Sequence, residues 1–282
     1  MSGFVANDVS ANGSALVDAI GTVHRAVTAG EAPRIVSLVP SVTELICDLG
    51  LAHWLVARTG FCIHPAEVLA PIAKVGGTKD VNLGKLRTLQ PTHVVVNIDE
   101  NEKPTVDQIA EFVPHIIVTH PLAPEDNLPL YRLLGGIFGA ETRAEALCAQ
   151  LEAELALTRE LASAMKDNGD ANKRVLYCIW QDPWMTVSRD TYIARMLALV
   201  GWQQWQPPSD ARYPAFRWSD ELAQQVDEVL LSSEPYRFTE DHADALERQL
   251  GKPVRVVDGE MLSWYGSRAI AGLRYLREIT NS

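Results

Sequence analysis

The sequence predicts an α/β protein of two lobes with mainly parallel sheets, joined by one long helix. Residues 142–166 form the longest uninterrupted helical pattern, and Leu147, Leu151 and Leu155 recur in it at helical spacing. At 1.5 Å per residue, this helix would be about 37 Å long, the height of a small domain. Strand and helix patterns alternate on both sides of it, with connections long enough for parallel pairing. One long helix packed on a single sheet is the alternative.

The first half of the chain divides into an extension and a lobe. Residues 1–32 are expected to form an N-terminal extension, weakly helical over 14–29, and residues 33–139 an N-terminal α/β lobe. The lobe opens with a buried-strand run that Pro40 and Ser41 turn directly into a helix, with Ser41 and Glu44 as a predicted capping box. Such a turn lies at the carboxyl edge of a sheet, where open α/β sheets bind ligands. The elements predicted here are strands 34–39, 55–57, 93–97 and 115–119 and helices 41–50, 83–89, 104–112 and 128–138.

The second half repeats this alternation after the long helix. Residues 140–170 are expected to form the connecting helix, starting at a capping box of Thr142 and Glu145, and residues 171–282 the C-terminal α/β lobe. The loose similarity of the two halves suggests a duplication. The elements predicted here are strands 174–179, 185–187, 228–231 and 254–257 and helices 191–199, 219–225, 241–250 and 267–279.

Composition excludes several functions. The net charge of −11 argues against nucleic acid as a partner, because affinity for phosphates is supplied by Lys and Arg. The four cysteines have neither zinc-type spacing nor a CxxC pair, so reduced thiols are expected. The sequence has no apolar run long enough for a membrane span, and its start has neither the basic residues nor the apolar run of a secretory signal. A cytoplasmic protein is therefore expected.

Aromatic residues follow several predicted strands. Trp180, Trp184 and Trp264 each come just after a strand, in a loop, whereas most tryptophans are core residues. Aromatic loops at strand ends suit a flat or apolar ligand. The alternative is that these side chains complete the core.

The loop at 61–65 combines a thiol and an imidazole. Cys62 and His64 are two residues apart in an extended segment and therefore share a face, which makes a soft-metal contact conceivable. A structural role is the alternative, since two ligands do not complete a metal site. Gly77 and Thr78 lie in a Gly-Gly-Thr-Lys turn that could approach an anionic group or be a plain tight turn. No catalytic triad or carboxylate pair is evident, so no enzyme is expected.

Taken together, these motifs resemble a known family. The strand and helix start at 34–44, the Phe-Cys-Ile-His-Pro loop, the Gly-Gly-Thr-Lys turn, the Leu/Pro/Val pattern at 86–96 and the central helix are similar to the helical-backbone substrate-binding proteins of cobalamin and iron-siderophore uptake. The resemblance implies a class III substrate-binding-protein fold. It also implies a metal chelate held between the lobes, no catalysis and no intrinsic cofactor.

The resemblance implies a cobalamin-like corrinoid as the ligand, with a ferric siderophore or haem as the second class. Two rivals are an enzyme or metallocofactor-assembly factor that uses Cys62 and His64, and a pure interaction module. His64 is the candidate axial metal ligand. The ligand-binding residues implied are Pro40, Ser41, Arg58, Phe61, Cys62, His64, Gly77, Thr78, Asn97, Glu100, Trp180, Trp184, Tyr236, Trp264 and Tyr265.

The sequence departs from the family pattern at the sites for docking to an ABC permease. Transport members present a glutamate from each lobe, and the first-lobe position in an Asn-Leu-Glu pattern is Gly84 here. Glu221 is the candidate for the second lobe. These departures make permease docking doubtful and, with the missing secretion features, favour an intracellular binder of the same fold.

Overall fold

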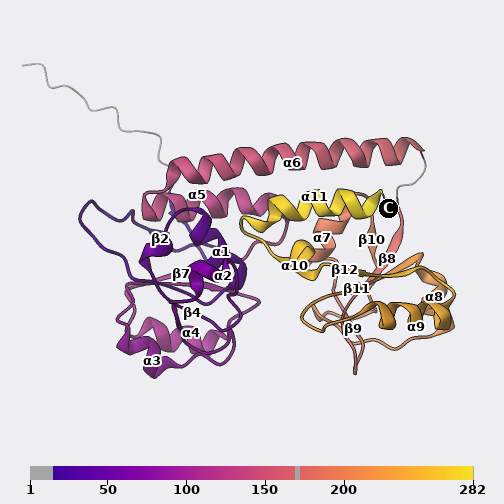
Figure 1. The fold of residues 1–282 in the computed structure, drawn as a ribbon, viewed down its shortest axis with the longest axis horizontal. Coiled ribbons are helices and arrows are strands. Elements are labelled where there is room, and N and C mark those ends of the chain that lie inside the picture. The colour runs from indigo at the N-terminus through magenta and orange to yellow at the C-terminus, as the bar shows by residue number, and fades with distance from the viewer. Residues whose placement is uncertain (1–14, 169–171, 282) are drawn as a thin grey trace, which may run out of the picture.

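One long helix spans both lobes of the molecule. The computed structural model describes residues 15–168 and 172–281. Helix α6 (Glu141–Asn168) runs along one side of the whole molecule, with α5 (Asn127–Phe138) beneath it at the first lobe and α11 (Arg268–Thr280) beneath it at the second (Figure 1). This confirms the predicted fold class, and the alternative of a single sheet is wrong.

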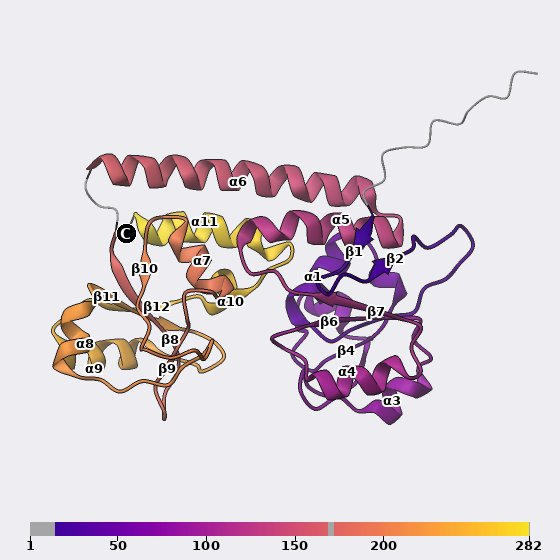
Figure 2. The same ribbon diagram turned by 180° about the vertical axis from the view of Figure 1, so that it is seen from behind.

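The first lobe is a five-stranded parallel sheet in the order β5-β4-β3-β6-β7. Helices α1 and α5 cover the face toward α6, and α3 and α4 cover the opposite face (Figures 1 and 2). The strands are β3 (Ile35–Ser37), β4 (Leu55–Arg58), β5 (Ala73–Lys74), β6 (His93–Asn97) and β7 (His115–Thr119). The helices are α1 (Pro40–Asp48), α2 (Ala66–Leu69), α3 (Leu83–Thr88) and α4 (Lys103–Ala110), with short 3₁₀ turns at Ala52–Trp54 and Pro124–Asp126.

The second lobe has a sheet in the order β10-β8-β11-β12, which is parallel, while β9 pairs antiparallel with β8. The strands are β8 (Arg174–Trp180), β9 (Met185–Thr186), β10 (Gln203–Gln204), β11 (Glu228–Ser232) and β12 (Val254–Val257). The helices are α7 (Tyr192–Ala198), α8 (Asp220–Gln225), α9 (Glu240–Leu250) and α10 (Gly259–Ser263).

A single hydrophobic core extends through both lobes on the α6 side. Alternate residues of each buried strand point to opposite faces, so Val95 of β6 and Leu230 of β11 pack toward α6, whereas Val94 and Val229 pack toward the outer helices. Leu151 of α6 is fully buried in the shared core. The two lobes are therefore joined by packing as well as by the chain.

Polar contacts reinforce the packing of α6 on α11. The Glu154 carboxylate of α6 accepts hydrogen bonds from Arg274 Nε at 2.6 Å and from Arg277, which also donates to the buried Thr158 hydroxyl at 2.9 Å. Because the carboxylate is largely buried, removal of either partner would leave a charge away from water. These contacts fix α6 to the last helix of the second lobe.

The predicted capping boxes do not form. Helix α1 starts after Val39 with Pro40 in its first turn and no side-chain cap, and Glu44 instead pairs with Arg268 of α11 at 2.7 Å. Helix α6 starts one residue earlier than predicted, and Glu145 pairs with Arg132 of α5 at 2.8 Å. In both cases a long-range arginine outcompetes the local backbone N–H for the glutamate.

The weak helical pattern before the first lobe is also wrong where the chain is described. Strands β1 (Leu16–Val17) and β2 (Val23–His24) form a hairpin there. The buried Asp18 carboxylate organises its turn and accepts a hydrogen bond from the backbone N–H of Val118 in β7 at 3.1 Å. The predicted extension before residue 15 lies outside the described residues. No helix within 15–168 or 172–281 is long and apolar enough to cross a membrane.

Candidate ligand-binding cleft

A cavity of about 570 Å³ lies between the two lobes. In the first lobe it is lined by segments that follow the carboxyl ends of β3, β4, β5, β6 and β7. In the second lobe its lining includes the ends of β8 and β11, the start of α7, Tyr213 and the loop after α10. Parallel strands end at the same edge of a sheet, so both lobes present their strand-end loops to one space. A depression of about 640 Å³ elsewhere is lined by the second lobe alone, around Trp184 and Trp218. We take the inter-lobe cavity as the candidate site because both lobes build it.

Two asparagines shape the first-lobe wall. The Asn97 side chain, at the end of β6, accepts a hydrogen bond from the Asp99 backbone N–H at 2.8 Å. The Asn101 amide donates to the Thr78 carbonyl at 2.9 Å and accepts from the Asn97 backbone N–H. These contacts hold the 97–101 loop against the turn that contains Thr78. Asp99 and Glu100 of this loop line the cavity.

The second-lobe wall includes a short loop between α10 and α11. Gly266 in this loop has a φ of +73° and lies so close to the Ser41 carbonyl that a Cβ atom would stand 2.8 Å from it. Its carbonyl accepts a hydrogen bond from the Tyr131 hydroxyl at 2.8 Å. The loop is thereby held against the first lobe, with Trp264 and Tyr265 lining the cavity.

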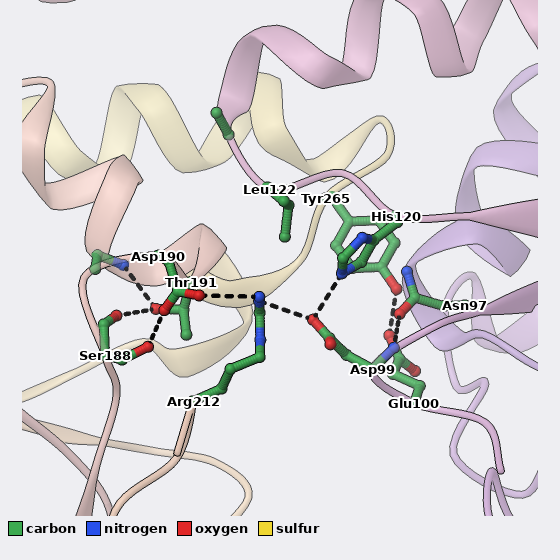
Figure 3. Close-up of polar contacts among 12 residues, drawn as sticks. Asn97, Asp99, Glu100, His120, Leu122, Ser188, Asp190, Thr191, Arg212 and Tyr265 are labelled. Atoms are coloured by element: carbon green, nitrogen blue, oxygen red, sulfur yellow. Dashed lines mark hydrogen bonds and ion pairs between the residues drawn. The ribbon is translucent and has the colours of Figure 1, made fainter. Parts of the chain in front are cut away.

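Two polar contacts cross the cleft (Figure 3). Arg212 of the second lobe pairs with Asp99 of the first at 3.0 Å, and His120 lies 3.4 Å from the same carboxylate. The Tyr265 hydroxyl donates a short hydrogen bond to Glu100. The structure therefore holds the lobes together at the cavity wall as well as along α6.

The carboxyl groups in the cavity are destabilised as anions. Burial raises the pKa of Glu100 to about 7, and repulsion from Asp99 and Glu234 adds to the shift while the Tyr265 hydrogen bond opposes it. Burial also raises the pKa of Glu234, against hydrogen bonds from Trp264 Nε1 at 2.8 Å and Ser263 Oγ at 3.1 Å. The cavity is thus apolar and aromatic over much of its wall, with negative charge concentrated at these carboxyl groups.

The structure brings many of the sequence-predicted residues together around the cavity. Those that line it are Pro40, Ser41, Phe61, Thr78, Asn97, Glu100, Trp264 and Tyr265. Those that lie outside its lining are Arg58, Cys62, His64, Gly77, Trp180, Trp184 and Tyr236. Gly77 is buried directly beside Thr78 and contributes only backbone to that turn.

Arg58 and Cys62 belong to the interior of the first lobe. The Arg58 guanidinium is buried and donates to the carbonyls of Leu69 and Cys62 at 3.0 and 2.9 Å. The Cys62 thiol is fully buried within 3.1 Å of the hydroxyls of Thr43 and Thr59, and burial raises its pKa. Neither side chain is part of the cavity lining, and the guanidinium satisfies loop carbonyls that would otherwise be buried without donors.

His64 is placed behind the cavity. Its Nε2 lies 3.0 Å from Glu260 of the second lobe, and its ring meets the Trp264 ring edge-on at 5.5 Å. Since the imidazole is engaged with this carboxylate and is not part of the cavity lining, the structure does not support it as an axial metal ligand. Over the described ranges, no group of three or more His, Cys, Asp or Glu side chains could hold a metal ion.

Trp180 at the end of β8, Trp184 after it and Tyr236 after β11 lie on the second lobe itself. Trp184 stacks on Phe238 with ring centres 5.7 Å apart, and Trp180 meets Tyr236 edge-on at 5.5 Å. Trp184 and Tyr236 pack against the outer core of the lobe and lie outside the cavity lining. Trp180 is 40% exposed outside the cavity lining.

Several lining residues were not predicted from sequence, among them Tyr213 and Glu234. Glu234 lies just beyond the carboxyl end of β11, so the strand-end rule that indicated Asn97 would have found it. Tyr213 lies in an irregular segment with no such signal. The other unpredicted lining residues are Ile63, Asp99, Pro121, Ile179, Thr191, Tyr192, Ile193, Pro235 and Ser263.

Comparison with known proteins identifies the family. The model of the periplasmic binding protein family matches residues 35–248. A vitamin B12-binding protein of Pectobacterium carotovorum is 21% identical over 237 residues, 84% of each chain. An uncharacterized ABC transporter substrate-binding lipoprotein of Bacillus subtilis is 27% identical over 265 residues, 88% of this chain and 80% of the relative. The apo structure of a periplasmic haem-binding protein from Roseiflexus superposes with a TM-score of 0.72 at 23% identity, over 89% of this chain and all of the other, and supports the fold alone.

These findings correct the expected location. The prediction of a cytoplasmic protein is wrong, because the matching family is one of periplasmic binding proteins and the Bacillus subtilis relative is a lipoprotein of an ABC transporter. The suggestion of an intracellular binder depended on that prediction and falls with it. The resemblance and the absence of enzymatic activity are confirmed, since the family and these relatives are binding proteins. The chain belongs to the periplasmic binding protein family.

Proposed function

We propose that this protein binds a metal chelate, specifically a cobalamin-like corrinoid, in the cleft between its lobes. The observation that carries the proposal is the cavity of about 570 Å³ whose aromatic and apolar wall is built by strand-end loops of both lobes. Such a surface suits one face of a large flat ligand, because aromatic rings supply contact area at little entropic cost. The likeness to a vitamin B12-binding protein over most of both chains supports the corrinoid.

Haem is the second candidate ligand. The protein from Roseiflexus supports this alternative, since it has a similar fold and is named a haem-binding protein. A ferric siderophore is the third chelate that the family resemblance suggests. The test is to titrate the purified protein with hydroxocobalamin, haem and a ferric siderophore and to follow tryptophan fluorescence and visible absorbance. It shows which of the three chelates binds. Absence of saturable binding by all of them would contradict the function.

Two alanine variants test whether the ligand binds in the cleft. Phe61, which is 63% exposed, lines the cavity from the first lobe, and Tyr213, 40% exposed, lines it from the second. Phe61→Ala and Tyr213→Ala should each weaken binding by about threefold to tenfold, the loss expected for one aromatic contact. Trp180→Ala is the matched control, because this ring is equally exposed but lies outside the cavity lining. An equal loss in the control would place the ligand elsewhere.

An ABC permease is the partner we propose. The relative from Bacillus subtilis belongs to an ABC transporter. Glu221 is exposed on α8 and Gly84 on α3, and both helices lie on the side of the molecule away from α6 (Figure 1). With glycine at position 84, docking would depend mainly on Glu221. Glu221→Lys should lower uptake of hydroxocobalamin by cells that depend on this protein while binding by the purified protein stays unchanged; unchanged uptake would contradict the docking role.

A further inference from the structure

The acidic and basic residues that line the cavity are all of one kind. The carboxyl side chains are Asp99, Glu100 and Glu234, and none of the described lining residues is Lys, Arg or His. Asp99 is compensated by Arg212 at 3.0 Å and by His120 at 3.4 Å. Glu100 and Glu234 have no cationic partner among the described residues, so the negative charge of the cavity belongs to these two.

Each of the two glutamates is held by donors on one oxygen only. Glu100 follows β6 of the first lobe, and its Oε1 accepts from the Tyr265 hydroxyl. Glu234 follows β11 of the second lobe, and its Oε1 accepts from both Trp264 Nε1 and Ser263 Oγ. Within the described part of the chain, Oε2 of each carboxylate has no donor. Two fixed carboxylates from opposite lobes therefore offer free acceptor oxygens to whatever occupies the cavity.

Both carboxyl groups are disfavoured as anions in this arrangement. Burial raises the pKa of Glu100 to about 7 and that of Glu234 above its usual range, and Glu234 adds to the shift of Glu100 by repulsion. A cation or an N–H donor placed between them would relieve the cost. A carboxylate placed there would add a third negative charge in a partly desolvated space.

We propose that Glu100 and Glu234 are specificity-determining residues, which favour a chelate whose edge places cationic or amide N–H groups between them and disfavour one whose edge places carboxylate or catecholate groups there. This inference rests on the proposed chelate-binding function and narrows the ligand class. An amide-fringed corrinoid with a cationic Co(III) centre satisfies the requirement. Haem with its two propionates and ferric catecholates with their net negative charge do not.

We call this discrimination by Glu100 and Glu234 the charge filter. A matched pair of ligands tests it directly. The probes are hydroxocobalamin and its monocarboxylic acid, in which one peripheral amide is hydrolysed, and haem is the third probe. At pH 8, above the pKa of about 7 that burial gives Glu100, the amide form should bind at least about tenfold more tightly than the acid, a difference of about 1.4 kcal/mol. Haem should show no saturable binding to the unmodified protein at micromolar concentration.

Isosteric variants then ask whether the two carboxylates cause the discrimination. Glu100→Gln and Glu234→Gln keep an acceptor oxygen for the existing donors, and each should reduce the preference for the amide form to below about threefold by strengthening binding of the acid. The double variant should gain saturable haem binding. Glu102→Gln is the charge-matched control, because Glu102 lies in the same loop but is exposed and pairs with Lys79. Urea unfolding of each variant checks that it is folded.

The outcomes separate the two proposals. Equal binding of the amide and the acid, tight haem binding by the unmodified protein, or a preference that neither glutamine variant changes would overturn the charge filter and leave chelate binding intact. Absence of binding by all three probes, in the unmodified protein and in the variants, would overturn the chelate function and the filter with it.

Discussion

Ionisation of Glu100 makes the stability of the protein depend on pH. Its carboxyl group faces Asp99, Glu234 and the Tyr265 hydroxyl, and burial raises its pKa to about 7 from the ordinary value of 4.5. Below pH 4.5 the group is protonated in both the folded and the unfolded chain and has no effect on stability. As the pH rises from 4.5 to 7, the unfolded chain loses this proton first, so the free energy of unfolding falls; above pH 7 the penalty is constant.

We therefore predict that Glu100→Gln stabilises the protein in a pH-dependent way. The free energy of unfolding of the variant minus that of the unmodified protein should grow between pH 5 and pH 7 and then level off. Urea unfolding at pH 5, 6, 7 and 8 measures this difference. Glu102→Gln, which removes an exposed carboxyl group two residues further along the chain, is the matched control. A flat difference for Glu100→Gln would show that its carboxyl group titrates normally.

His64 gives the second prediction at the residue scale. Because its imidazole pairs with Glu260 and is not part of the cavity lining, His64→Ala should leave the visible band of bound hydroxocobalamin in place. The affinity should change by less than about threefold, since only an indirect effect through the neighbouring Trp264 ring remains. Absorbance titration makes the test. A shifted band in the variant would mean that His64 reaches the metal in the complex.

At the scale of elements, helix α6 packs against both lobes and joins them. Leu151 and Leu155 are buried in the core shared by both lobes, with 0% and 2% exposure, whereas Leu157 on the same helix is 48% exposed. The helix alone would be only marginally stable in water, so this buried stripe provides most of the stabilisation. Loss of one buried leucine leaves a cavity that a rigid helix pair cannot close.

We predict that Leu151→Ala lowers the free energy of unfolding by about 2–5 kcal/mol. Leu157→Ala is the matched control, with the same chemistry in the same helix, and should change stability by less than about 0.5 kcal/mol. Chemical denaturation monitored by circular dichroism measures both. Similar losses in the two variants would mean that burial in the shared core does not govern the contribution of α6.

At the scale of the whole molecule, the two lobes are joined in several independent ways. The α6-side core is continuous across them, Arg268 pairs with Glu44, and Gly266 is hydrogen-bonded to Tyr131 of the first lobe. Interfaces of this kind resist hinge bending, in contrast to domains linked only by flexible strands. Ligand binding should therefore leave the relative placement of the lobes nearly unchanged.

The corresponding prediction concerns the size of the molecule in solution. Small-angle scattering with and without saturating hydroxocobalamin should give radii of gyration that agree within about 1 Å, in contrast to the larger closure of hinged binding proteins. Saturation is checked in the same sample by absorbance. A change of several ångströms would show that the shared core yields when the ligand binds.

The sequence by itself determined most of the longer elements and their order. Buried strands such as 93–97 and the long helix are encoded by local periodicity, and parallel pairing follows from the length of the connections. The rule that ligands lie at strand ends pointed to the loops around Ser41, Asn97 and Glu100, and in the structure all three line the inter-lobe cavity. It would have led to Glu234 as well.

Tertiary structure alone decided which side chains pair and which face the ligand. His64 meets Glu260 across 196 residues of sequence, and Tyr265 meets Glu100 across 165. Glu44 could cap its own helix, yet it pairs with Arg268. Local patterns specify the backbone that a segment adopts, but the partner of a long charged side chain depends on which distant segment packs beside it. For that reason the sequence located the cleft, and only the folded molecule showed that its uncompensated charge is negative.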